Sequence, residues 1–593
     1  MTSAFRLRQT EGKHGCLWRV SFARLLLGRG FSGLGSVLTL CVTLVWAPNM
    51  GALAAPDAGA LQQQIEREQA RPLPQQGATE VVPPPAAASP KRGNALEVMG
   101  FKFKGNTLIR SAELEVALEE YRTKRLDFAE IDGLSQAIAA FYRARGFLAS
   151  VVLPAQDVSD GVVTFVVLEA TVGKVVTEPQ SGARTDPQRV QALVAAQLPQ
   201  GEVFRAAPLD RALLLANDLP GVAVTGALAE GEAGRQTDLV LKVVDKPLWS
   251  GDATLDNAGG RSTGVNRLSM NGNGHGVLGL GDLWSASALA NQGSTYLRLG
   301  ATAPVGLDGW RLGANASRLE YHVIDADYAS QRLEGASAVL GLEAMYPLVR
   351  AQQHNLYFSA ALDDKSFINY ASGSAVSDYA SRALAWSLYG NRFDDFAGGG
   401  STNGNITITQ GHLVLDNYPN HAADASTVQT AGDYRKLRYG LSRLQFIAQD
   451  LTLLASLSGQ WTDQNLDSSE KFGLGGSTGV RAYPGGEGSG ALGQLLSAEL
   501  RWRWSDALVL SAFYDTGSVT INARNNFTGA SALNAYALSG GGLALAWQWD
   551  NRASAKLTWA RRNGNNPNPA ANGNDQDGTL VQDRLWASAS LAF

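Results

Sequence analysis

From residue 248 to the C-terminus, short segments alternate between apolar and polar residues, and turns rich in Gly, Asn and Asp separate them. In the clearest segment, residues 494–504, one face carries Leu496, Ala498, Leu500, Trp502 and Trp504, and the other carries Ser497, Glu499, Arg501 and Arg503. Successive side chains of a strand point to opposite faces, so this period predicts strands with one apolar side. No helical pattern remains in the region to cover that side, as the core of a soluble protein would require.

About 16 such segments fit into residues 248–593, which matches the even strand number of outer-membrane barrels. In lipid every backbone polar group must find a partner within the protein, so such a sheet has to close on itself. We therefore predict a transmembrane antiparallel β-barrel of about 16 strands for residues 248–593.

The aromatic residues fit the same prediction. Of the 13 Trp residues, two lie in the first 50 positions and the other eleven lie between Trp249 and Trp586, mostly near the ends of predicted strands. This is the placement of an interfacial aromatic girdle. The chain ends on an alternating strand with an aromatic residue, Phe593, which we interpret as a barrel-assembly signal.

The first 54 residues have the pattern of a secretory signal peptide. A basic segment precedes an apolar core of about 13 residues, and small residues follow at Ala52-Leu53-Ala54. An uncleaved membrane anchor is the alternative, but the apolar core is short for a membrane span. After it, no apolar run is long enough for a transmembrane helix, which excludes a helical polytopic membrane protein.

Removal of the leader changes both the thiol content and the charge of the chain. Both cysteines, Cys16 and Cys41, lie in the leader, so the mature chain has no thiol for a disulfide, a metal or a nucleophile. The leader carries six basic residues and one acidic residue, or +5, so the remainder carries −4 − 5 = −9. A chain this acidic is a poor ligand for nucleic acid.

Between the leader and residue 96, the sequence predicts a polar helix on a tether. Residues 55–75 are rich in Gln, Glu and Ala and have almost no apolar face, so they form a helix or remain disordered. Residues 76–95 are rich in Pro and Ala and predict an extended linker.

Residues 96–172 and 173–247 predict two successive β-α-α-β-β units, which form a repeat. In the first unit, Ser111 is expected to cap one helix. Asp127 with Glu130 is expected to form a capping box at the start of the next helix.

Signals for enzymatic or metal chemistry are weak. Residues 475–479 match the G-x-S-x-G pattern, but no helix is predicted to follow and no His occurs after His421. Residues 274–279 match G-x-G-x-x-G without a βαβ unit. The six His residues show no metal-binding spacing. We predict no enzyme activity, no metal and no cofactor.

Four sequence motifs together resemble those of a known family. They are Tyr142, Gly146 and Phe147 with Leu153-Pro154-Ala155-Gln156, Asp160-Gly161 and Glu169 in the first unit; Asn217-Asp218-Leu219-Pro220-Gly221 in the second; Gly479-Val480-Arg481-Ala482-Tyr483-Pro484 in a long loop; and Phe513-Tyr514-Asp515-Thr516-Gly517 on the thirteenth strand. With these motifs, nearly the whole chain resembles the TpsB-type two-partner secretion transporters, the haemolysin secretion/activation (ShlB/FhaC/HecB) family.

The resemblance implies two POTRA-like periplasmic domains, a plug helix in the lumen and a functional pair of motifs. The first motif is Val480, Arg481, Ala482 and Tyr483 on the inward-folded loop, and the second is Phe513, Asp515 and Gly517 on the barrel wall. The wider superfamily has Gly where this chain has Ala482, so its local backbone is expected to differ, because Ala tolerates positive φ less well.

Strand alternation places Asp515 on the lumen side, where a carboxylate on a wall of low polarity needs a partner. Arg481 is the candidate partner. By position alone, Arg481 as a solvated loop residue is the better interpretation, and the resemblance is what favours the pair.

The resemblance further implies an outer-membrane translocator of a Gram-negative bacterium, with its N-terminal domains in the periplasm. It would capture a large secreted exoprotein (TpsA-type) by strand addition and export it unfolded without nucleotide hydrolysis, since no P-loop is present. Outer-membrane lipid and the barrel-assembly machinery would be further partners. A passive porin and a barrel-assembly protein of the same superfamily are the alternatives. The exoprotein could be an adhesin, a cytolysin or a toxin.

Overall fold

The computed structural model describes residues 57–68, 81–82, 96–178, 184–232, 236–415, 419–550 and 552–593. The predicted signal peptide, residues 1–54, lies outside these residues. Of the predicted plug segment and linker, the structure describes helix α1 (Ala58–Glu68), the residue before it, and strand β1 (Val81–Val82). None of the described helices is both long and apolar enough to cross a membrane.

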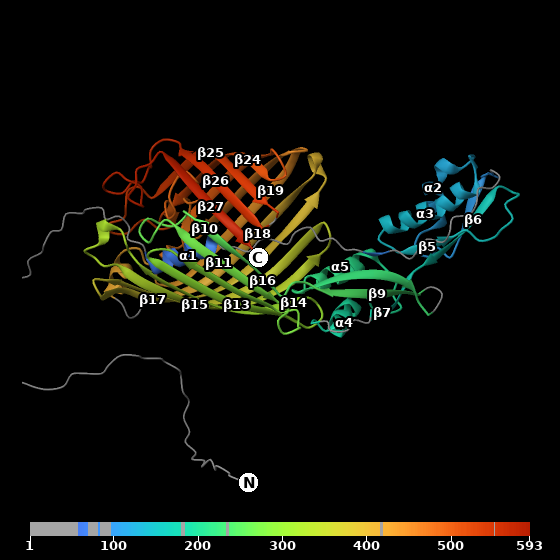
Figure 1. Ribbon diagram of the computed structural model, residues 1–593, viewed down its shortest axis with the longest axis horizontal. Helices are drawn as coiled ribbons and strands as arrows, with labels where there is room; N and C mark the ends of the chain where they lie inside the picture. The colour runs from blue at the N-terminus through green and yellow to red at the C-terminus, as the bar shows by residue number, and fades with distance from the viewer. Residues whose placement is uncertain are drawn as a thin grey trace, which may run out of the picture. The chain divides into compact units, whose positions relative to one another are not determined.

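The first α+β unit consists of a three-stranded sheet covered by two helices (Figure 1). Its elements are β2 (Leu96–Glu97), β3 (Gly100–Lys104), α2 (Ser111–Ala117), β4 (Arg125–Leu126), α3 (Phe128–Ala144), β5 (Ala149–Val152) and β6 (Val162–Glu169). The sheet order is β3-β6-β5, with β2 and β4 forming a separate pair. Apolar residues of both helices pack against β6, whose Val163, Phe165 and Val167 are buried in the same core.

The helix starts show what local sequence signals can determine. The capping box is confirmed, because Asp127 Oδ1 accepts from the Glu130 N–H at 2.8 Å and Glu130 Oε2 accepts from the Asp127 N–H at 2.7 Å. The predicted cap at Ser111 is wrong. Helix α2 begins at Ser111 itself, and Arg110 precedes it without a side-chain cap. Ser111 is therefore the first helical residue and not the cap, and its hydroxyl accepts from the Asn106 side chain at 3.1 Å.

The second unit repeats this topology with β7 (Thr171–Thr177), α4 (Pro187–Gln197), α5 (Ala206–Asn217), β8 (Val222–Glu230) and β9 (Gln236–Asp245). In each main sheet the first strand, β3 or β7, pairs in parallel with the last, β6 or β9, and the last pairs antiparallel with the strand before it. The second sheet has one addition. Strand β1 pairs in parallel with β8, with Val81 opposite Gly226 and Val82 opposite Ala227. A segment of the predicted linker therefore occupies the β8 edge of the second unit.

The C-terminal region forms a closed antiparallel barrel of sixteen strands, which confirms the predicted fold (Figure 1). The strands are β10 (Trp249–Asp256), β11 (Arg267–His275), β12 (Leu283–Ala290), β13 (Ser294–Val305), β14 (Trp310–His322), β15 (Glu334–Arg350), β16 (His354–Ala371), β17 (Ser374–Asp394), β18 (Gly400–Val414), β19 (Gly432–Ala448), β20 (Leu451–Trp461), β23 (Leu492–Arg503), β24 (Leu508–Thr520), β25 (Ala535–Trp549), β26 (Ala553–Arg562) and β27 (Asp583–Ala592). The first and last strands, β10 and β27, pair with each other and close the sheet.

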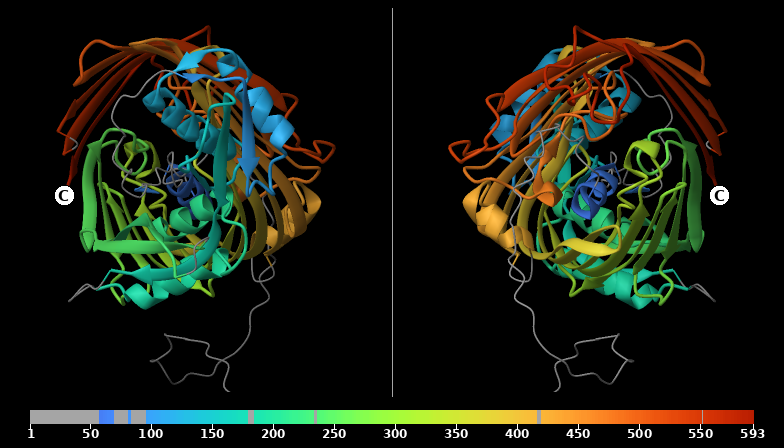
Figure 2. Two further views of the ribbon diagram at one scale, coloured as in Figure 1. Left: turned by 90° about the vertical axis from the view of Figure 1, so that its right-hand side faces the viewer. Right: turned by 90° about the vertical axis from the view of Figure 1, so that its left-hand side faces the viewer.

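Two elements fill part of the barrel interior. Helix α1 lies inside the ring of strands, where it appears in blue in Figure 2, and contacts β14, β15 and β16. The second element is the long loop, residues 462–491 between β20 and β23, which contains the short strands β21 (Phe472–Gly473) and β22 (Ser489–Gly490). Residues 468–470 of this loop, the short 3₁₀ helix Ser468–Glu470, pack on α1.

Candidate functional site

The centre of the candidate site is an ion pair between Arg481 of the long loop and Asp515 of strand β24. Arg481 Nε lies 2.8 Å from Asp515 Oδ2 and Nη2 lies 2.8 Å from Oδ1, so the contact is bidentate. The Arg481 N–H also donates to Asp515 Oδ2 at 3.2 Å. Asp515 is fully buried and Arg481 is 6% exposed. The structure thus brings the two residues together on the lumen side, where strand alternation had placed Asp515.

A second carboxylate shares the same guanidinium. Arg481 Nη1 donates to Glu499 Oε2 at 2.6 Å, and Arg501 Nε donates to Glu499 Oε1 at 2.7 Å. Two arginines and two carboxylates therefore balance in charge. Burial alone would lower the pKa of Arg481, but the hydrogen bonds and charges of Asp515 and Glu499 outweigh it and raise that pKa above its ordinary value.

Register explains why Glu499 reaches the pair. Ser497 of β23 lies opposite Asp515 of β24, and Glu499 lies one step further on the same face. The Ser497 hydroxyl donates to Asp515 Oδ1 at 2.7 Å, which satisfies the carboxylate further. Sequence reasoning placed Glu499 on the polar face of its strand but gave it no role, because the register between two strands is not visible in either one.

The aromatic and aliphatic residues of the two motifs form the packing around the ion pair. The guanidinium carbon of Arg481 lies 3.3 Å from the ring centroid of Phe513, a cation–π contact. Val480, Ala482 and Tyr483 are buried in one apolar cluster with Phe513. Packing as well as charge therefore holds residues 480–483, the tip of the long loop, against the barrel wall.

Glycines on the wall make room for this packing. A Cβ at Gly517 would lie 2.5 Å from Leu474 Cδ2 and 2.6 Å from the Gln494 carbonyl oxygen. A Cβ at Gly540 of β25 would lie 2.5 Å from the Ala482 methyl carbon. Ala482 is not among the residues of positive φ, so its side chain needs no strained backbone, and the missing side chain at Gly540 makes room for its methyl group.

Trp586 of the last strand also holds the loop tip, and sequence reasoning missed it. Its indole Nε1–H donates to the Arg481 carbonyl oxygen at 2.7 Å. Trp586 is 7% exposed, whereas the other ten Trp residues of the barrel region are exposed. The alternation of Leu585 and Ala587 with Trp586 was the available signal, because it turns the indole to the opposite face. Phe593 itself is exposed and exchanges two backbone hydrogen bonds of 2.9 Å with Gly251 of β10.

Helix α1 is anchored to the barrel wall by side-chain hydrogen bonds. Gln62 is 2% exposed, donates to Ser317 at 3.2 Å and accepts from Ser337 at 2.9 Å. At the helix end, Glu68 pairs with Arg267 at 2.6 Å. A cavity of about 420 Å³ remains beside the helix, lined by residues that include Leu61, Gln64 and Arg67.

The stem of the long loop is anchored separately from its tip. Glu470 is 3% exposed and pairs with Lys365 of β16 at 2.9 Å and with Lys436 of β19. Burial would raise the pKa of Glu470, but these cations lower it well below its ordinary value. Helix α1 and the residue before it contact the same part of the loop, since Ser468 donates to Asp57 at 2.7 Å and Arg67 donates to the Gly473 carbonyl at 2.8 Å.

The motif residues of the two N-terminal units stabilise local turns. Glu169, 3% exposed, accepts from Tyr142 at 3.0 Å and from the Thr107 and Leu108 N–H groups at 2.7 Å. In the second unit, Asn217 bridges α5 and β8 through the Leu213 carbonyl and the backbone of Val224.

The neighbouring motif residue, Asp218, makes a bidentate pair with Arg350 at the end of β15, at 2.7 and 2.8 Å.

Among the described residues, no group of three or more His, Cys, Asp or Glu is placed to hold a metal ion.

Comparisons with known proteins are consistent across the chain. The model of the haemolysin secretion/activation protein ShlB/FhaC/HecB family matches residues 235–545, and that of the ShlB-type POTRA domain matches residues 96–170. The heme/hemopexin transporter protein HuxB of Haemophilus influenzae is 24% identical over 534 residues, covering 86% of this chain and 93% of its own. The outer membrane transporter CdiB of Dickeya dadantii is 24% identical over 475 residues, covering 77% and 82%.

Solved structures show the same fold. CdiB from Escherichia coli superposes with a TM-score of 0.62 at 18% identity, covering 90% of this chain and 98% of that structure. BamA from Haemophilus ducreyi lacking POTRA domains 1–3 superposes with a TM-score of 0.53 at 14% identity, covering 84% and 100%.

Proposed function

Because this chain belongs to the haemolysin secretion/activation protein ShlB/FhaC/HecB family, we propose that it captures a secreted exoprotein in the periplasm and exports it unfolded through its barrel. The chain is an outer-membrane transporter of the two-partner secretion type, and its POTRA region lies on the periplasmic side. The family shows the transport class, while the mode of capture and the state of the cargo are our proposal.

The observation that carries the proposal is the way the lumen is filled. A barrel wall cannot open or close without breaking its ladder of hydrogen bonds, but α1 and the long loop are held by side chains and can leave. Side-chain contacts of Gln62 and Glu68 hold helix α1 to the barrel wall, and those of Arg481 hold the loop tip. A passive porin would have no use for two removable elements in its lumen or for two POTRA-like units.

For capture, we propose strand addition to the POTRA-like sheets. In the first unit β5 is an edge strand. In the second unit the β8 edge already pairs with β1, so an exoprotein strand would have to replace β1 there. We propose that export needs no catalysis by this chain. The sequence has no P-loop for nucleotide hydrolysis, so folding of the exoprotein outside the cell would make its export directional. The other proposed partners are outer-membrane lipid and the barrel-assembly machinery, which would recognise Phe593 as an assembly signal.

Co-expression with exoproteins encoded beside this gene tests the proposal. The full chain should release its exoprotein into the medium, and Arg481→Ala should reduce that release while the heat-modifiable barrel band stays normal. A chain that conducts ions in planar bilayers but releases none of these exoproteins would be a porin, and the proposal would fail.

A further inference from the structure

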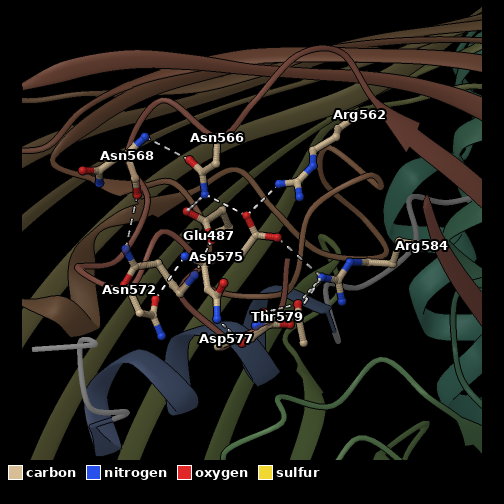
Figure 3. A network of polar contacts seen from close by, with 12 residues as sticks. Glu487, Arg562, Asn566, Asn568, Asn572, Asp575, Asp577, Thr579 and Arg584 are labelled. Atoms are coloured by element: carbon tan, nitrogen blue, oxygen red, sulfur yellow. Dashed lines mark hydrogen bonds and ion pairs between the residues drawn. The ribbon is translucent and has the colours of Figure 1, made fainter. Parts of the chain in front are cut away.

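The long loop meets the barrel at a second place, distant in sequence from the Arg481 contact. This place is the terminal loop, residues 563–582 between β26 and β27. Glu487 of the long loop is fully buried. It lies among residues of the terminal loop (Figure 3). Its Oε1 accepts from the Asn566 amide at 3.0 Å, and its Oε2 accepts from the Gln576 backbone N–H at 2.8 Å.

This contact continues to the barrel wall. The Asn566 amide also donates to Asp575 Oδ1 at 3.0 Å, and Arg562 of β26 donates to the same oxygen at 2.8 Å. Asp575 is fully buried, Arg562 is 3% exposed and Asn566 is 8% exposed. Asn566 therefore joins two buried carboxylates, Glu487 of the long loop and Asp575 of the terminal loop, and both accept from its single NH₂ group.

The charges of the network do not balance around Glu487. Arg562 is paired with Asp575, and Arg584 of β27 lies 3.3 Å from Asp577. Among the described residues, the Glu487 carboxylate accepts its hydrogen bonds from two neutral donors, Asn566 and Gln576. The titratable and charged groups around it are Asp575 and Asp577 of the terminal loop, Arg562 of β26, Arg584 of β27, Tyr483 of the long loop and Tyr536 of β25.

We propose that Glu487 and Asn566 form a second latch, which holds the long loop to the terminal loop independently of the Arg481–Asp515 pair and weakens as the pH rises. The latch deepens the proposed function, because it would set how readily the loop leaves the lumen. It does not depend on which exoprotein is carried.

The pH dependence follows from the burial of Glu487. Burial, helped by the nearby Asp575 and Asp577, raises the pKa of Glu487 to about 7, against the donors Gln576 and Asn566. In a released, solvated loop the same carboxyl has its ordinary pKa. The latched state therefore holds the proton more tightly, and the latch is strongest below the ordinary pKa and is lost progressively up to about pH 7. Across this range the latch equilibrium changes on the order of 100-fold.

A single spin label on the full mature chain tests the latch. Because both cysteines lie in the leader, Thr478→Cys on an exposed part of the long loop provides the only thiol. In proteoliposomes, the mobile fraction of the label should rise from pH 5 to pH 8. Asn566→Ala should raise it several-fold at pH 5. Asn565→Ala, at an exposed neighbouring position of the same loop, is the matched control and should behave as the parent.

Glu487→Gln gives the second readout, since glutamine does not titrate. The variant loses one acceptor oxygen, so the mobile fraction of its label should lie between those of the parent and Asn566→Ala at pH 5. This fraction should not change with pH. In an Arg481→Ala background, Asn566→Ala should mobilise the loop further. The proposal is overturned if Asn566→Ala matches Asn565→Ala, or if Glu487→Gln keeps the parental pH response. Since loop mobility is measured and not export, failure here leaves the proposed function untouched.

Discussion

At the residue scale, the contact that matters most is one guanidinium shared by two carboxylates. Arg481 serves Asp515 bidentately and Glu499 with its remaining nitrogen, so the three groups are not equivalent. Loss of Asp515 leaves Arg481 a partner, whereas loss of Arg481 leaves two buried acids, of which only Glu499 keeps another cation, Arg501. Removing one member of a buried pair costs about 3–5 kcal/mol.

We therefore expect Arg481→Ala to reduce export more than Asp515→Ala, with both variants inserted as normal heat-modifiable barrels. The double variant should be no worse than Arg481→Ala, because the two residues act as one unit. Exoprotein in the medium, normalised to barrel band intensity, measures this. Additive defects, or full export by Arg481→Ala, would show that the pair does not hold the working state.

A second residue-scale prediction concerns Glu169 in the first unit. Burial would raise its pKa, but hydrogen bonds from Thr107, Tyr142 and Leu108 lower that pKa below the ordinary value. Its contribution to stability is therefore present above the ordinary carboxyl pKa and lost as the pH falls through the lowered one. Glu169→Gln should cost about 1–3 kcal/mol, because buried donors lose their acceptor.

Hydrogen exchange at the Leu108 amide of the full chain measures this loss. Exchange should accelerate in Glu169→Gln and, in the parent, on acidification beyond the intrinsic pH effect. Glu119→Gln, whose side chain is 61% exposed, is the control. Equal protection of Leu108 in both variants would contradict the role given to Glu169.

At the element scale, helix α1 fits its place because it lacks a side chain where it is most crowded. A Cβ at Gly59 would lie 2.5 Å from the Tyr379 hydroxyl oxygen and 3.0 Å from Ser469 Cβ. The next residue, Ala60, instead lines the cavity beside the helix. Gly59→Val should therefore expel α1 and raise the baseline conductance of single channels in planar bilayers, as deletion of residues 57–72 should.

Ala60→Val adds a similar side chain on the open side and should leave the conductance low. If Gly59→Val conducts no more than Ala60→Val, the crowding at Gly59 does not hold the helix, and if the deletion leaves conductance unchanged, α1 does not plug the pore.

Elements with a strict period were predictable, and contacts between them were not. Alternation fixes which face a side chain takes, so the sixteen strands and the inward direction of Asp515 followed from the sequence. The partners of Glu499 and Glu487 depend on strand register and on loops that meet across the barrel, and no period governs these. Ser111 failed as a cap because helix α2 begins at Ser111 itself, so Arg110 occupies the cap position.

At the scale of the whole molecule, one chain connects the plug in the lumen with a sheet edge of the second unit. Twelve residues separate strand β1 from α1, and its described residues, Val81 and Val82, pair with β8. An exoprotein strand that adds to β8 must first displace β1, so its apparent affinity is reduced by the fraction of β8 edges that β1 occupies. The exoprotein strand and β1 of the linker then compete for the same edge of β8.

Proline substitution separates these states. In an edge strand only alternate N–H groups face the partner, so one of Val81 and Val82 donates to β8 and the other faces away. Val81→Pro and Val82→Pro should therefore differ, each serving as the control for the other. Loss of the bonding N–H costs about 1 kcal/mol, so one variant should bind its exoprotein about fivefold more tightly in the full chain, and the other should bind as the parent does.

Titration with the exoprotein found by co-expression measures this. Equal affinities in both variants and the parent would show that β1 does not compete for the edge, and capture would then fall to the β5 edge of the first unit.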